Sequence, residues 1–64
     1  MIAIFKVRHA RGFGFVRLED GTEPFVPAHL LELSRDVFQP GDRVTVELRT
    51  QPDGRVRVTS IYAA

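Results

Sequence analysis

The chain has 64 residues, a net charge of +1 at pH 7 and no cysteine. We expect one domain over residues 1–64, with a small core that buries about 60% of the unfolded chain's surface. The lack of cysteine excludes disulfides and thiolate metal sites. The apolar runs are too short for a membrane span or a signal peptide, which predicts a cytoplasmic protein without membrane contacts.

Residues 1–8 are rich in β-forming residues and predict a first strand. Three of its apolar members are Ile2, Ile4 and Val7. The alternation is imperfect, which indicates a bulge or a strong bend. We expect Lys6 and Arg8 to share one face, beside the aromatic residues of the next strand. His9 follows as an exposed loop residue, with a stacking or phosphate-contacting role as the alternative.

The most informative stretch is residues 11–18, Arg-Gly-Phe-Gly-Phe-Val-Arg-Leu. Read as a strand, it places Phe13, Phe15 and Arg17 on one face, because side chains alternate. The glycines and aliphatic residues lie on the other face, where the missing side chains let the strand bend. Unpaired bases stack on such rings while phosphates follow the positive charges. The stretch fits the ribonucleoprotein signature at every position except Leu18, where an aromatic is expected.

The charge distribution is uneven. Four basic residues precede the first acidic residue, Glu19, and these are Lys6, Arg8, Arg11 and Arg17. A polarised surface attracts an anionic partner more effectively than the small net charge does. The alternative is that the arginines only solvate strand faces, while the rings pack under a loop or against a partner chain.

Residues 19–22 carry the Asp-Gly pair of a tight hairpin. Residues 24–27, Pro-Phe-Val-Pro, predict a brief third strand, which the prolines confine to an edge or a short pairing. We expect Phe25 to face outward and to join Phe13 and Phe15 in one aromatic surface.

Residues 28–33 are the only plausible helical segment, and the segment is too short to be stable alone. It is expected to close one end of the core through Leu30 or Leu31. We expect His29 on the surface, as a candidate contact for nucleic acid. Phe38, in the following loop, is expected to point into the core.

Residues 43–49 alternate most regularly, and residues 55–59 form the returning strand after a Pro-Asp-Gly turn. The residues expected to face the core are Val44, Val46, Leu48, Val56, Val58 and Ile61. Five short strands with one helical turn between the third and fourth predict an all-β fold. We expect a five-stranded antiparallel Greek-key barrel of the oligonucleotide-binding (OB) type, partly open, with an SH3-like barrel as the alternative.

Three segments together resemble the cold-shock domain family: residues 11–16 (RGFGFV), 24–27 (PFVP) and 40–47 (PGDRVTVE). The resemblance covers essentially the whole chain. It implies a cold-shock type OB barrel that binds single-stranded RNA or DNA through two aromatic motifs on adjacent strands. Phe13 and Phe15 match the first motif, and the phenylalanine of the second segment matches the stacking residue of the second motif.

Two positions depart from the family pattern. Lys6 stands where the family usually has a stacking tryptophan, and Pro27 stands where the second motif usually has histidine. Residues 25–31 (FVPAHLL) and 41–44 (GDRV) are also similar to the cold-shock-like RNA-binding domains of ribonuclease II/R-type exoribonucleases. With one stacking ring fewer, we expect weak, salt-sensitive and sequence-tolerant binding.

These patterns predict a binding module that acts as an RNA chaperone. The expected nucleic-acid contacts are Lys6, Arg8, Arg11, Phe13, Phe15, Arg17, Phe25 and His29. The sequence has no nucleophile–base pair, metal-ligand spacing or phosphate loop, so we expect neither an enzyme nor a cofactor. The alternative is a protein–protein module that uses the same phenylalanines. We expect a monomer, with a weak dimer as the other possibility.

Overall fold

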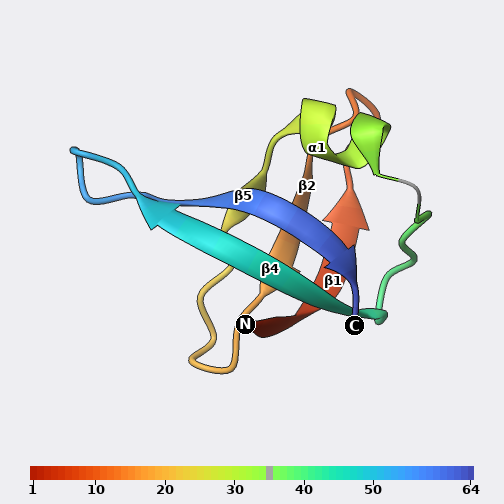
Figure 1. Cartoon of the computed structure of the whole chain (residues 1–64), viewed down its shortest axis with the longest axis horizontal. Helices are drawn as coiled ribbons and strands as arrows, with labels where there is room; N and C mark the ends of the chain where they lie inside the picture. Colours follow the sequence, from red (N-terminus) through yellow and green to blue (C-terminus); the bar gives the residue numbers. More distant parts are fainter. Residues whose placement is uncertain (35) are drawn as a thin grey trace.

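The computed structural model describes residues 1–34 and 36–64. In chain order, the elements are β1 (Ile2–Arg8), β2 (Gly14–Arg17), β3 (Phe25–Val26), α1 (Ala28–Leu33), β4 (Arg43–Thr50) and β5 (Val56–Ala63). The strands close into a barrel in the order β1-β2-β3-β5-β4, and α1 lies at one end of it (Figure 1). The predicted all-β barrel with one short helix between its third and fourth strands is confirmed. Within the described ranges, no helix is long and apolar enough to cross a membrane.

The strand pairings define an OB-type barrel. Four neighbouring pairs are antiparallel, and the short β3 pairs with β5 in parallel. This parallel contact, between Phe25 and Arg57, closes a barrel that the sequence had suggested to be partly open. It also brings the start of β5 beside Phe25 of β3.

One apolar core fills the barrel. Every strand contributes inward-facing side chains, and α1 contributes one. The buried residues are Ala3, Phe5, Val16, Leu18, Val26, Leu31, Val44, Val46, Val58 and Ile61. Phe38 packs against this core, with its ring centroid 5.7 Å from that of Phe5. The predictions that Leu31 closes one end of the core and that Phe38 points into it are therefore confirmed.

The predicted irregularity of β1 is a bulge. The register with β2 shifts between Phe5 and Val7, which leaves Lys6 as the extra residue. Val7 consequently lies opposite Phe15, and Arg8 lies opposite Gly14. Because directly opposite residues share a face, the expectation that Arg8 lies on the same face as the aromatic residues is wrong.

The β4–β5 hairpin differs from the prediction at its tip. Val56 was expected in the core but is 42% exposed. It pairs with Thr50 in the part of the hairpin that extends beyond the barrel, so it has no core to enter (Figure 1). Nearer the barrel, the register changes from Val58 to Ser60, and this shift allows Val58 and Ile61 both to face inward.

Gly14 marks the closest approach of β2 to β1. A Cβ atom there would lie 2.8 Å from the carbonyl oxygen of Val7 and 3.2 Å from Cδ1 of Leu31. We expect Gly14→Ala to lower the free energy of unfolding by about 1–3 kcal/mol through overpacking. Urea denaturation measures the change. Alanine in a strand is otherwise favoured over glycine by roughly 0.5–1 kcal/mol, so an unchanged or raised midpoint would contradict the steric argument.

Candidate nucleic-acid interface

Three phenylalanine rings gather on the outer surface of β2 and β3. We call Phe13, Phe15 and Phe25 the aromatic platform. Phe15 and Phe25 are directly paired between the two strands. The ring centroids lie 6.0 Å apart for Phe13 and Phe15, 5.4 Å for Phe13 and Phe25, and 6.0 Å for Phe15 and Phe25. The structure thus brings together the three rings that the sequence predicted to share a surface.

The turn between β1 and β2 positions the first ring of the platform. The N–H of His9 donates to the carbonyl of Phe13 at 2.6 Å, and the N–H of Gly12 donates to the carbonyl of His9 at 2.8 Å. Gly12 has φ +103°, a conformation that side chains other than glycine rarely adopt. The glycine therefore allows the tight turn that places Phe13 at the start of β2.

His9 belongs to the same group of rings. Its imidazole stacks on Phe13 with a centroid distance of 4.5 Å and an interplanar angle of 7°. The sequence placed His9 in an exposed loop, and this contact was missed. A local signal exists, because His9 and Phe13 flank a short turn and closing that turn brings their rings together.

The platform remains partly open to solvent. Phe25 is 41% exposed, whereas Phe13 and Phe15 are half-buried. Phe15 is steeply inclined to both neighbours, with interplanar angles of 85° to Phe13 and 68° to Phe25. Flat ligands would therefore stack on single rings, at different angles, and not as one continuous column.

Two of the predicted basic contacts are engaged within the protein. Arg17 forms an ion pair with Glu23, with 3.0 Å between Nη2 and Oε2. Because both side chains are exposed, this pair is worth at most about 1 kcal/mol, and a phosphate can compete for the guanidinium. Arg8 donates from Nε to the carbonyl oxygen of Gly12 at 3.2 Å, so its side chain lies against the turn between β1 and β2.

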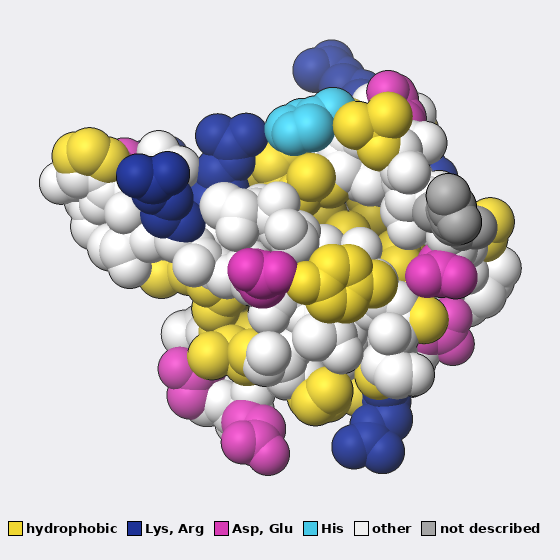
Figure 2. All heavy atoms as spheres, in the orientation of Figure 1, with side chains coloured by type: hydrophobic (Ala, Val, Ile, Leu, Met, Phe, Trp, Pro, Cys, Tyr) yellow, Lys and Arg dark blue, Asp and Glu magenta, His cyan; other side chains and the backbone are white. Residues whose placement is uncertain are grey.

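The remaining predicted contacts are distributed over the surface. Lys6 is half-buried at the bulge of β1, and Arg11 is exposed in the turn beside His9. His29 makes none of the ring contacts of the platform. It lies on α1 and lines a separate groove with Arg49 and Arg57. In the space-filling view, basic side chains lie beside a histidine at the upper rim of the molecule (Figure 2).

No family model, no curated protein and no solved structure matches this chain. In the part of the chain that the structure describes, no group of three or more histidine or acidic side chains is placed to hold a metal ion. The aromatic platform and the charges around it are therefore the features of this chain that point to a function.

Proposed function

We propose that this chain is a cold-shock-like OB barrel that binds single-stranded nucleic acid, RNA or DNA, on the aromatic platform. The observation that carries the proposal is the grouping of three phenylalanine rings on adjacent strands, with Phe25 substantially exposed. Aromatic rings that face solvent in a purely structural strand cost free energy, whereas base stacking on them is favourable.

Binding combines stacking with phosphate attraction. Each base stacked on an aromatic ring contributes about 1–3 kcal/mol, and any base can stack because every base has a flat π face. Arg11 supplies positive charge two residues from Phe13, and Arg17 does so when it leaves Glu23. Lys6 adds positive charge at the bulge of β1, next to the Val7 that lies opposite Phe15. Such binding is tolerant of sequence and weakens as salt rises.

This mode of binding selects unpaired strands, because the bases of a duplex are already stacked and their faces are covered. A protein that binds only the melted form of a hairpin shifts the equilibrium toward that form by mass action. The proposed activity is therefore that of an RNA chaperone.

Fluorescence anisotropy tests the proposal. A labelled unpaired RNA of ten nucleotides is titrated with protein at low and moderate salt, beside the same sequence as DNA and as a duplex. We expect the single strands to bind more tightly than the duplex, with a logarithmic salt slope of about −0.7 for each phosphate contacted. Equal affinity for the duplex, or no binding at low salt, would refute it.

A second candidate is a protein–protein module. Val7, opposite Phe15, is 48% exposed, and Val56, near Phe25, is 42% exposed, so aliphatic groups extend the platform on both sides. An extended apolar face suits a protein partner or a second copy of the chain. Sedimentation over a wide concentration range distinguishes the two proposals, since a dimer closed over the rings would exclude RNA.

A further inference from the structure

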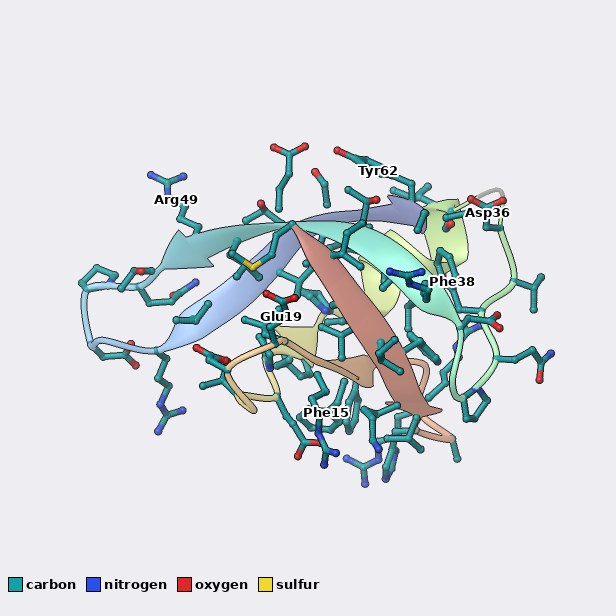
Figure 3. The ribbon with its side chains drawn as sticks, turned by 90° about the horizontal axis from the view of Figure 1, so that it is seen from below. Phe15, Glu19, Asp36, Phe38, Arg49 and Tyr62 are labelled. Atoms are coloured by element: carbon teal, nitrogen blue, oxygen red, sulfur yellow. The ribbon has the colours of Figure 1, made fainter. Side chains whose placement is uncertain are left out.

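The register of the barrel continues the platform around the molecule. Phe15 pairs with Phe25, Phe25 pairs with Arg57, and Arg57 pairs with Arg49. These residues form a transverse row over β2, β3, β5 and β4, and side chains that lie opposite each other share a face. Figure 3 shows Phe15 and Arg49 on opposite sides of the barrel, so the row wraps around it. The row is aromatic at one end and cationic at the other.

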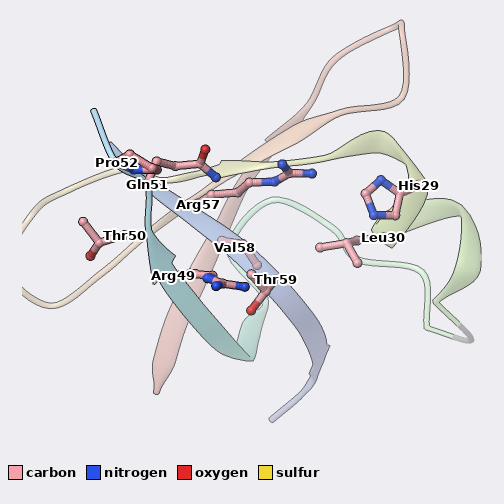
Figure 4. A pocket seen from close by; sticks show the side chains of 9 residues that line it. All are labelled: His29, Leu30, Arg49, Thr50, Gln51, Pro52, Arg57, Val58 and Thr59. Atoms are coloured by element: carbon pink, nitrogen blue, oxygen red, sulfur yellow. The ribbon is translucent and has the colours of Figure 1, made fainter. Parts of the chain in front are cut away.

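The cationic end of the row borders a groove of about 520 Å³ between α1 and the β4–β5 hairpin. Figure 4 shows Arg49, Arg57 and His29 around it, with Leu30 and Val58 among the apolar residues. The amide of Gln51 is a further polar group there. Among the described lining residues none is acidic. The groove therefore offers hydrogen-bond donors and positive charge to an anion.

Two arginines directly opposite each other destabilise a sheet unless an anion lies between them. Arg17 and Arg55 each have a carboxylate partner. In residues 1–34 and 36–64, neither Arg49 nor Arg57 lies within ion-pair distance of a carboxylate. Guanidinium groups are suited to phosphate because their planar donors match its oxygens. We propose that this groove is a phosphate site for the nucleic acid held on the platform.

Two shallow hollows lie between the platform and the groove. One shallow hollow is lined by Phe15, Phe25 and Val56, and the next is lined by Phe25, Val56 and Arg57. Arg57 also lines the groove. Asp53 is the acidic residue that lines the second hollow, and it forms an ion pair with Arg55, with 3.6 Å between Oδ2 and Nε. Because neighbouring hollows share lining residues, they offer a strand a path from the rings to the groove.

The spacing of the row sets the length of strand required. Three strand-to-strand steps of about 4.8 Å separate Phe15 from Arg49, roughly 14 Å in all. Stacked as in one strand of a duplex, at about 3.4 Å per nucleotide, a strand takes about four steps to cover this distance. A strand extended from ring to ring covers it in fewer steps. A dinucleotide has a single step and is too short to reach Arg49 from the rings, whereas a decanucleotide reaches it. The phosphate is either internal to a long strand or the terminal phosphate of a shorter one, which carries more charge.

The inference rests on the proposed function, and the test compares two substitutions of equal charge. Arg49→Gln removes a guanidinium from the groove, and Arg43→Gln removes one from the opposite end of β4. With an RNA decanucleotide without terminal phosphates, we expect Arg49→Gln to weaken binding roughly three- to tenfold. It should also reduce the salt slope by about 0.7. Arg43→Gln should change neither quantity, and neither variant should alter the binding of a dinucleotide.

Nuclear magnetic resonance locates the contact. The decanucleotide should shift the backbone amides of Thr50 and Gln51, next to Arg49, and the dinucleotide should not. Tetranucleotides carrying a 5′ phosphate, a 3′ phosphate or neither distinguish a terminal from an internal source. A terminal source is indicated if one phosphorylated form gains affinity and Arg49→Gln abolishes the gain.

The outcomes separate the two proposals. If the wild-type protein binds neither the dinucleotide nor the decanucleotide, the proposed function and the phosphate groove both fail. If it binds the decanucleotide, but Arg49→Gln matches Arg43→Gln in affinity and salt slope, only the phosphate groove is overturned.

Discussion

Replacing Phe13 and Phe15 together by alanine is expected to weaken the binding of unpaired RNA by about thirtyfold or more. Two lost stacks remove about 2–6 kcal/mol, since each is worth about 1–3 kcal/mol, and 1.4 kcal/mol is a factor of ten in affinity. The two losses are not independent, because both rings also contact Phe25 at 5.4 and 6.0 Å. Removing them together leaves Phe25 without its ring neighbours, so the double variant measures the whole platform.

The control for this experiment is Tyr62→Ala. Tyr62 is an exposed aromatic residue of β5, and its hydroxyl hydrogen-bonds to Glu47. Figure 3 shows Tyr62 on the side of the barrel opposite Phe15. Its removal should leave RNA affinity unchanged in anisotropy titrations. Equal losses in Tyr62→Ala and in the double variant would show that the rings act through stability and not through contact. Circular dichroism verifies that both variants are folded.

The platform was predictable because its signals are local. Alternation fixes which side of β2 carries Phe15, and the buried Val16 on the other side holds that orientation. The short segment between two prolines places Phe25 beside it, since the flanking prolines allow only a brief pairing. Two residues in adjacent strands are then neighbours without any long-range information.

The sequence-based predictions that were wrong are those that depend on strand register. The sequence indicated a bulge in β1 but not its position, and one extra residue transfers every later side chain to the other face. Arg8 was misplaced for this reason. The same ambiguity obscured the first-strand core, where the buried residues are Ala3 and Phe5.

The cationic groove was not predictable from any local pattern. Alternation with Leu48 places Arg49 on the outer face of β4, but its position relative to the platform depends on the parallel pairing of β3 with β5. That pairing joins segments about thirty residues apart, and it exists only because the barrel closes. Secondary-structure propensity and residue spacing are local properties, so they do not predict a long-range pairing of this kind.

Replacing Phe5 by alanine is expected to remove most of the stability of the barrel. A domain of this length has roughly 3–10 kcal/mol of unfolding free energy, at about 0.05–0.15 kcal/mol per residue. A buried Phe→Ala change costs about 3–5 kcal/mol. The side chain of Phe5 is 1% exposed and contacts the ring of Phe38, so its removal leaves a cavity in the core.

Urea denaturation followed by circular dichroism measures this loss, with Phe5→Leu as the control, which removes less volume and is expected to cost less than Phe5→Ala. Phe5→Ala keeps every ring of the aromatic platform, so its RNA affinity should fall only in proportion to the fraction unfolded. Saturating RNA should then raise its melting temperature, because a ligand that binds only the folded state stabilises it. A midpoint equal to that of the wild type would contradict the packing of Phe5. Lost stability without rescue by RNA would instead contradict binding by the folded barrel.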